Sequence, residues 1–199
     1  MIELDEKLKE YGKNHKVPIS LDDTLNFLIE TIENSNSKMI LEIGTAIGYS
    51  SISIAMNTEC DHIDTIEIDK DRFNIAKQNV SDHNLNDRIS LYNVDALDFI
   101  KSIKNKYDFI YLDGPKGQYI NYLPYLIKIL KDGGIIFADN LYFHGMVTGK
   151  IPVSKGCRAM IKGLHRYIDA IKTDPMLDTK IYDIGDGIGV SKKIGNQSL

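Results

Sequence analysis

The stretch that decides the fold is MILEIGTAIGYS, residues 39–50. Its apolar start, residues 39–43, is typical of a strand that is buried on both faces. The chain then passes through a turn of small residues into SSISIAM, residues 50–56, which predicts a helix. Gly44 and Gly48 bracket this turn, and glycine allows a ligand to approach the backbone closely. A strand, turn and helix in this order are typical of the ligand-binding corner of an open α/β sheet.

The spacing of the two glycines narrows the class of ligand. The pattern is Gly-x-x-x-Gly with Glu42 ahead of it, and it lacks the Gly-x-Gly-x-x-Gly that brings a pyrophosphate to a helix N-terminus. We therefore expect a nucleoside ligand without a diphosphate, such as S-adenosylmethionine. Glu67 ends the next apolar strand, about 20 residues further on, where a carboxylate can accept both ribose hydroxyls. The alternatives are a plain strand-to-helix connection and a solvated acid at a strand end.

From residue 39 onward the pattern alternates between strands and helices. Strands are predicted at 39–43, 62–67, 89–93, 107–112 and 134–139, with helices at 49–57, 70–83, 96–104 and 116–131 between them. This alternation predicts an α/β fold with a mostly parallel sheet and helices on both faces. A further amphipathic helix is predicted at about 154–172.

Composition limits the possible classes of protein. A chain of 199 residues with 43% hydrophobic content suits one domain with a well-buried core. The net charge of −4 gives no general attraction for nucleic acid, so such a partner requires a local basic patch. Cys60 and Cys157 lack disulfide or zinc spacing. No apolar run approaches the length of a membrane span, and the start MIELDEKLKEYGK is charged, so we expect a cytoplasmic protein without a membrane partner.

Residues 1–36 predict two helices before the first core strand. The first, at 2–16, would bury one apolar face, and the second would begin with Ser20 as its N-cap. The apolar faces consist of Leu4, Leu8 and Tyr11 in the first helix and Leu21, Leu25, Leu28 and Ile32 in the second. We expect these helices to cover the cofactor site or to form the surface of a homodimer. Plain packing is the alternative.

Polar residues follow the predicted strands, where ligands bind in a parallel sheet. The residues directly after the five strands are Gly44, Glu67, Asp95, Asp113 and the pair Asp139-Asn140. Asp95 and Ala96 are placed to contact an adenine. The alternative is that Asp95 caps the helix that follows it.

Two neighbouring strand ends carry hard oxygen ligands. Asp113, Asp139 and Asn140 offer two carboxylates and an amide, a set that favours Mg²⁺, Mn²⁺ or Ca²⁺ over Zn²⁺. Lys116 follows Asp113 by three residues and could act as a general base toward a hydroxyl that the metal has acidified. The alternatives are acids that only cap helices and a plain surface lysine.

Five ordered motifs resemble one known family. They are LEIGTAIGYS (41–50), TIEID (65–69), YLDGPKGQY (111–119), FADN (137–140) and IGDGIGVSKK (184–193). Together they resemble the metal-dependent class I O-methyltransferases of the catechol and caffeoyl-coenzyme A type. The resemblance runs from about residue 15 to 193 and departs from many relatives at Gly114-Pro115, where those have two alanines.

The resemblance implies a fold, a cofactor and site residues. The fold would be Rossmann-like, with an antiparallel pair of strands at the C-terminal end. S-adenosylmethionine would be held by Gly44, Gly48, Ser50, Glu67, Asp95, Ala96 and Asp113. The metal would lie on Asp113, Asp139 and Asn140, with Lys116 as the base.

Within the family, the chain resembles the bacterial tRNA 5-hydroxyuridine methyltransferases in particular. The similar pieces include HKVPI (15–19), KGQY (116–119) and DNLYFHG (139–145). This resemblance implies methylation of wobble 5-hydroxyuridine to 5-methoxyuridine, with the tRNA anticodon stem-loop as partner. The cations Lys155, Arg158, Lys162 and Arg166 on the outer face of the predicted helix 154–172 would then bind its phosphates. A solvated helix face and a small catechol or acyl-coenzyme A substrate are the alternatives.

Two other classes of protein fit less well. A dinucleotide-dependent oxidoreductase is disfavoured by the glycine spacing and by the predicted metal ligands. A cofactor-binding regulator without catalysis would have no use for Lys116 beside those ligands.

Overall fold

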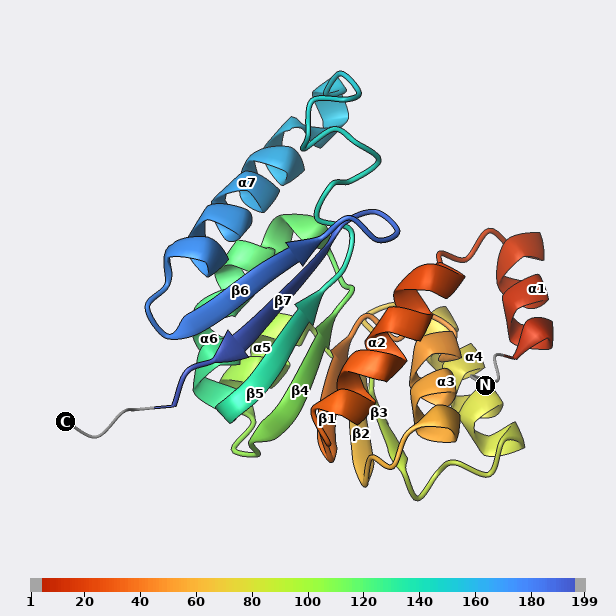
Figure 1. The fold of residues 1–199 in the computed structure, drawn as a ribbon. Helices are drawn as coiled ribbons and strands as arrows, with labels where there is room; N and C mark the ends of the chain where they lie inside the picture. Colours follow the sequence, from red (N-terminus) through yellow and green to blue (C-terminus); the bar gives the residue numbers. More distant parts are fainter. Residues whose placement is uncertain (1–4, 196–199) are drawn as a thin grey trace. The chain divides into compact units, whose positions relative to one another are not determined.

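The apolar runs and amphipathic segments form the predicted strands and helices in the computed structural model, which describes residues 5–195 (Figure 1). The chain divides into two compact units, residues Met1–Phe99 and Ile100–Leu199. Helix α5 (Ala96–Ser102) begins in the first unit and ends in the second. The seven strands of the described region carry the two candidate ligand sites at their ends.

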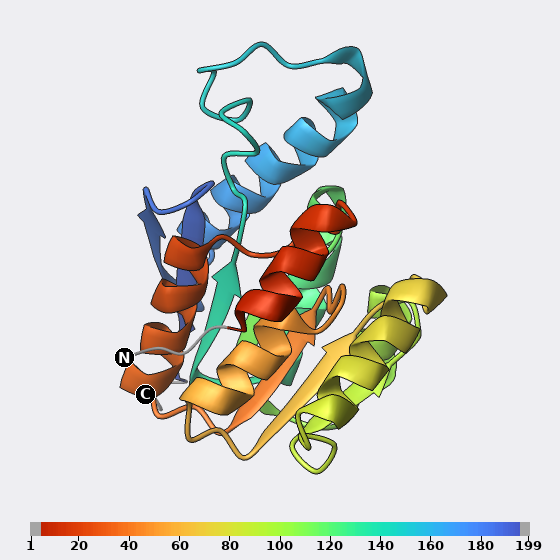
Figure 2. The same ribbon diagram turned by 90° about the vertical axis from the view of Figure 1, so that its right-hand side faces the viewer.

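The first unit contains three parallel strands in the order β3-β2-β1. Its elements are α1 (Glu6–Asn14), α2 (Asp22–Asn34), β1 (Met39–Ile43), α3 (Tyr49–Asn57), β2 (His62–Ile66), α4 (Lys70–Asp82) and β3 (Ile89–Tyr92). Right-handed crossovers between parallel strands place α3 and α4 on the same face. Figure 2 shows both helices, in light orange and yellow, on the viewer's side of these strands. The apolar run of β1 is buried, which explains why it reads as continuously hydrophobic.

The second unit combines a parallel pair of strands with an antiparallel pair. Its elements are β4 (Tyr107–Leu112), η1 (Lys116–Gln118), α6 (Tyr119–Ile129), β5 (Leu130–Ala138), η2 (Lys155–Cys157), α7 (Arg158–Thr173), β6 (Leu177–Tyr182) and β7 (Ile188–Lys193). The strand order is β4-β5-β7-β6, with β4 and β5 parallel and β7 antiparallel to both of its neighbours. Helices α6 and α7 pack against each other and against this sheet (Figure 1).

These elements confirm the predicted α/β fold with its mostly parallel strands and its antiparallel C-terminal pair. The predicted helix 116–131 is a short 3₁₀ turn followed by α6, which ends at Ile129 because the chain enters β5 directly. Strand β5 therefore begins four residues before the predicted start. The predicted helix 154–172 is likewise a 3₁₀ turn, η2, followed by α7.

The predicted start of the second helix was wrong. Helix α2 begins at Asp22, and Leu21 rather than Ser20 occupies the N-cap position, without a side-chain cap. Because Leu21 is extended and precedes the first helical turn, its side chain leaves the apolar face and is 58% exposed. The other three predicted apolar residues of this helix are buried.

The first helix also differs from its prediction. Asp5 is the N-cap of α1 and accepts hydrogen bonds from the backbone N–H groups of Lys7 and Leu8. Leu8 is buried as predicted, whereas Tyr11 is 36% exposed and stacks on His15 with ring centroids 3.9 Å apart. The predicted apolar residue Leu4 lies outside the described residues. The single domain and the role of residues 1–36 in covering the site or forming a homodimer stay predictions.

Between residues 5 and 195, no helix combines the length and the apolar character that crossing a membrane requires.

The loop after β5 is held by the turn before β7. The backbone N–H groups of Leu141 and Tyr142 donate to the carbonyls of Gly187 and Asp186, at 2.9 and 2.8 Å. Gly187 has a φ of +84°, and a Cβ there would lie 2.5 Å from the ring of Tyr142. This glycine is therefore required both by the backbone conformation and by the close approach of the ring.

We predict that Gly187→Ala destabilises the protein by clearly more than Gly149→Ala, as measured by urea unfolding. Both glycines have a left-handed φ, but a Cβ on Gly149 would meet no atoms within 4 Å among the described residues beyond its chain neighbours. Gly149→Ala should therefore carry only the left-handed backbone penalty of about 1–2 kcal/mol. Equal losses in the two variants would contradict the packing role of Gly187.

Candidate active site

The turn between β1 and α3 is organised around Glu67, which follows β2. The carboxylate of Glu67 accepts a hydrogen bond from the backbone N–H of Ala46 at 2.9 Å and one from Asp69 at 2.8 Å. Its side chain is buried, with 7% of the residue exposed. Ala46 and Gly48 in the turn both have positive φ values, of +49° and +85°. The sequence-predicted glycine turn and the predicted ribose ligand are thus brought together in the first unit.

A second buried carboxylate, that of Glu42 in the middle of β1, was not predicted as part of the site. Glu42 is 0% exposed. It accepts hydrogen bonds from the hydroxyls of Ser50 and Ser51 at the start of α3 and from Thr65 on β2. These donors compensate the cost of burying the charge and fix the helix start relative to the strand. The sequence signal that could have indicated this role is the presence of an acid within an otherwise apolar strand.

Ser50, a predicted cofactor ligand, therefore also has a structural role through Glu42. Asp95 is exposed, and one of its carboxylate oxygens accepts hydrogen bonds from the backbone N–H groups of Leu97 and Asp98, at 2.8 and 3.2 Å. The capping alternative for Asp95 is thus present in the structure. Ala96 is buried at the start of α5. Direct contact of these residues with a cofactor stays a prediction.

In the second unit, the parallel pairing of β4 and β5 brings two acids together. Leu112 pairs with Ala138, so Asp113 and Asp139 follow at equivalent positions. The hydroxyl of Tyr111 lies 3.3 Å from an oxygen of Asp113 and 3.5 Å from an oxygen of Asp139. One phenol therefore reaches both carboxylates, and sequence reasoning did not predict this bridging role.

The electrostatics of the acid pair are unbalanced. Burial and the charge of Asp113 raise the pKa of Asp139 to about 7, although the backbone N–H of Asn140 donates to its carboxylate at 2.6 Å. Lys116 lies 2.6 Å from the carboxylate of Asp113, and this pair is largely buried. Lys116 thus pairs with Asp113, while the ionised form of Asp139 stays unfavourable because it is buried beside a negative charge.

The chemistry of these side chains fits a hard cation. Within residues 5–195, no group of three or more His, Cys, Asp or Glu side chains is arranged to hold a metal ion. The strand-end set has two carboxylates, those of Asp113 and Asp139. Asn140 adds an amide oxygen, and its side chain has no hydrogen-bond partner in the described part of the chain. Its φ of +58° is left-handed, which asparagine tolerates better than most residues. A cation would relieve the repulsion between Asp113 and Asp139.

Lys116 and helix α7 belong to one packed assembly. Gly117, directly after Lys116, packs against Met160 and Gly163 of α7. A Cβ on Gly163 would lie only 3.1 Å from the carbonyl oxygen of Gly117, so the helix and the η1 turn are in close contact. This contact fixes the start of α7 beside the turn that carries the predicted base.

The predicted basic face of α7 points outward. Its cations Arg158, Lys162 and Arg166, together with Lys155 in the preceding η2 turn, are all exposed, and none of the four forms an ion pair with a carboxylate in the described region. The opposite face buries Ile161, Leu164, Tyr167 and Ile171. The predicted orientation of this helix is confirmed, and its binding of nucleic acid stays a prediction.

The protein has the α/β fold of the class I methyltransferases. Its strands are mostly parallel, a glycine-containing turn follows β1, and acids follow the strand ends. A protein of Staphylococcus aureus, whose assignment as a caffeoyl-CoA O-methyltransferase is provisional, has this fold with a TM-score of 0.88. It is 32% identical, and the match covers 94% of this chain and 91% of that one. An O-methyltransferase of Bacillus cereus, solved in complex with SAH, shares the fold at 23% identity, with a TM-score of 0.82 and coverage of 94% and 89%.

The chain belongs to the O-methyltransferase family, whose profile matches residues 2–194. A caffeoyl-CoA O-methyltransferase of Citrus natsudaidai is 30% identical over 86% of this chain and 78% of that protein. The protein is therefore an S-adenosylmethionine-dependent O-methyltransferase of the caffeoyl-CoA O-methyltransferase type.

We predict that Glu67→Ala weakens S-adenosylmethionine binding at least tenfold, which corresponds to about 1.4 kcal/mol. The variant would lose the predicted ribose contacts and the hydrogen bond that holds the turn at Ala46. Calorimetric titration measures the affinity, and Asp61→Ala, an exposed acid just before the other end of β2, serves as the control. An unchanged dissociation constant for Glu67→Ala would place the ribose elsewhere.

We predict that Asp139→Asn removes a pH-dependent loss of stability in the metal-free protein. Because the pKa of Asp139 is raised from 3.8 to about 7, the folded state keeps a proton that the unfolded state loses within this window. Stability of the parent protein should therefore fall as the pH rises from about 4 to 7, and this decline should be smaller in the variant.

Thermal melting in EDTA at about pH 5 and about pH 8 measures the difference. Addition of Mg²⁺ at the higher pH should raise the melting temperature of the parent more than that of the variant, because the cation offsets the charge repulsion. Parallel pH profiles together with equal responses to Mg²⁺ would argue against a charged acid pair that holds a cation.

Proposed function

We propose that this O-methyltransferase methylates the 5-hydroxyl of 5-hydroxyuridine at the wobble position of tRNA, with a hard divalent cation on Asp113, Asp139 and Asn140. The product is 5-methoxyuridine. The observation that carries the tRNA part of the proposal is the exposed basic face of α7, because this helix packs directly on the η1 turn that begins at Lys116.

The charge of this region supports a polyanionic substrate. Between His144 and Lys172 the sequence has six cations and one acid, Asp169, in a protein with a net charge of −4. Solvated helix faces usually mix both signs, whereas phosphate-binding faces concentrate Lys and Arg. A stem backbone lying along α7 would present its phosphates to this face while a loop nucleotide reaches the acid pair.

The substrate chemistry fits the same acids. 5-Hydroxyuridine carries its hydroxyl next to the O4 carbonyl, much as a catechol carries two neighbouring hydroxyls. A cation held by Asp113, Asp139 and Asn140 would supply Lewis acidity, which would lower the pKa of the hydroxyl. Lys116 takes the hydroxyl proton, the oxygen forms a bond to the methyl carbon, and the carbon–sulfur bond of the cofactor breaks to leave S-adenosylhomocysteine.

The ion pair between Lys116 and Asp113 sets a condition for this role. An ammonium group that holds a carboxylate at 2.6 Å has no free electron pair with which to accept a proton. Lys116 must therefore lose its proton and its contact with Asp113 before it acts as a base. Both changes would be favoured if the carboxylate of Asp113 held the proposed cation and released Lys116.

A small substrate is the second candidate. The relative from Citrus natsudaidai is a caffeoyl-CoA O-methyltransferase, and the caffeoyl group carries two neighbouring hydroxyls that the same acid pair suits. This alternative gives the basic face of α7 no necessary part in catalysis. The two candidates therefore differ in their dependence on that face.

We predict that reversing Lys155, Arg158 and Lys162 to Glu weakens tRNA binding at least tenfold and flattens its salt dependence. Each lost phosphate contact should reduce the slope of log K against log salt by up to about 0.9. Methylation of a free catechol should hardly change, because the acid pair and Lys116 are retained.

The matched control reverses three exposed lysines elsewhere, Lys70, Lys77 and Lys180, and so changes the net charge equally. Filter binding at several salt concentrations compares both triple variants with the parent. If the α7 variant bound and modified tRNA like the parent, the small substrate would become the preferred one.

A further inference from the structure

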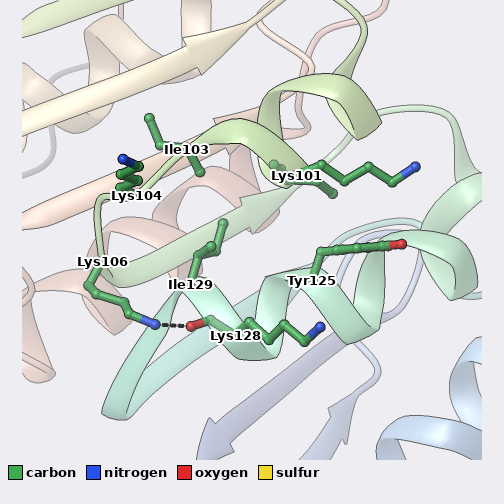
Figure 3. Close-up of a pocket in the computed structure, with 8 residues that line it drawn as sticks. Lys101, Ile103, Lys104, Lys106, Tyr125, Lys128 and Ile129 are labelled. Atoms are coloured by element: carbon green, nitrogen blue, oxygen red, sulfur yellow. Dashed lines mark hydrogen bonds between the residues drawn. The ribbon is translucent and has the colours of Figure 1, made fainter.

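A basic hollow of about 390 Å³ lies in the second unit at the end of β4 opposite to Asp113 (Figure 3). It is lined by four lysines, three isoleucines and one tyrosine: Lys101, Lys104, Lys106, Lys128, Ile100, Ile103, Ile129 and Tyr125. Strand β4 has six residues, so at about 3.3 Å per residue the hollow is about 20 Å from the acid pair. It is therefore separate from the candidate site of methyl transfer.

The hollow forms where two helices end. Lys101 lies in the last turn of α5 and Lys128 in the last turn of α6. The side chain of Lys106, in the connection before β4, donates to the backbone carbonyl of Lys128 (Figure 3). Ile100 and Ile129 are buried beneath these polar groups. The arrangement thus has an apolar base and a basic rim.

The C-terminal ends of the two helices offset only part of the positive charge of the four lysines. The C-terminus of a helix carries roughly half a negative charge, so α5 and α6 together offset about one of the four ammonium charges. No Asp or Glu lines the hollow, and none of its four lysines forms an ion pair with a described carboxylate. The nearby Lys131, by contrast, pairs with Asp108 at 2.9 Å. About three positive charges therefore remain uncompensated.

Tyr125 supports two of the lysines. The ammonium nitrogens of Lys101 and Lys128 lie 5.4 and 5.6 Å from the centre of its ring, within the range of cation–π contacts. In Figure 3 the two lysines extend on opposite sides of Tyr125. Because cations flank the ring, we expect Tyr125 to hold the ammonium groups in place rather than to stack on a base.

We propose that this hollow binds an oligophosphate anion, such as the triphosphate of a nucleotide. A terminal phosphate group carries about −1.5 to −2 at neutral pH, so two or three linked phosphates match the uncompensated charge, whereas a single phosphate does not. The limited volume and the separate position favour a free small anion over the RNA that the proposed function requires. The proposal does not depend on which substrate is methylated.

The test is calorimetric titration of the full-length protein with tripolyphosphate at low ionic strength. We expect saturable binding that weakens at least tenfold in the double variant Lys101→Gln and Lys128→Gln. The control, Lys77→Gln with Lys180→Gln, removes two exposed lysines elsewhere and should bind like the parent. Thermal melting of each variant verifies that it is folded.

A pair of variants tests the role of the ring. Tyr125→Phe retains the ring face and should bind tripolyphosphate like the parent, whereas Tyr125→Leu should bind it several times more weakly. Equal binding by both variants would contradict the supporting role of the ring.

Titrations with inorganic phosphate and with an oligoribonucleotide test whether the hollow prefers an oligophosphate to a single phosphate or to RNA. Inorganic phosphate that bound as tightly as tripolyphosphate would overturn an oligophosphate site. A single-stranded oligoribonucleotide that depended on Lys101 and Lys128, with no binding of tripolyphosphate, would make the hollow part of an RNA surface and would also overturn it. Equal affinity of the lysine variant and the parent for tripolyphosphate would show that the hollow is not the binding site.

Discussion

The parallel pairing of β4 and β5 is the constraint on which the second unit depends, because it sets Asp113 and Asp139 side by side at the strand ends. Burial of Asp139 and, after it, repulsion by the charge of Asp113 raise the pKa of Asp139. The surrounding groups reduce this cost only in part: Lys116 pairs with Asp113, and the hydroxyl of Tyr111 reaches both acids. An arrangement that is unfavourable by itself would become favourable if it held the proposed cation.

The buried acids of the first unit differ from this pair, because each accepts hydrogen bonds from neighbouring donors. Glu42 receives three hydroxyl hydrogen bonds and needs no further partner. Glu67 receives two backbone hydrogen bonds, which hold the turn after β1 and leave acceptor capacity for a ligand. Hydrogen bonds from neighbouring groups stabilise the carboxylates of Glu42 and Glu67, whereas the carboxylate of Asp139 lies next to the negative charge of Asp113.

The sequence was sufficient to predict the fold and to identify the residues that follow the strands. Alternating apolar strands and amphipathic helices predicted the sheet, and strand-end positions predicted that Asp113 and Asp139 would meet. Side-chain contacts that do not follow from the order of the strand ends were not predictable. Examples are the hydroxyls around Glu42 and the lysines that α5 and α6 bring together at Tyr125. The position of Leu21 was missed because the helix starts one residue later than predicted, which leaves Leu21 at the N-cap and outside the apolar face.

The most direct test of the account uses purified protein, S-adenosylmethionine with an isotopically labelled methyl group, and tRNA that contains 5-hydroxyuridine. Mass spectrometry of the digested nucleosides should detect labelled 5-methoxyuridine when Mg²⁺ is present and almost none in excess EDTA. Unchanged 5-hydroxyuridine under conditions in which caffeoyl-CoA accepts the label would contradict the tRNA substrate. Equal labelling with and without EDTA would contradict the role of the paired acids as a cation site.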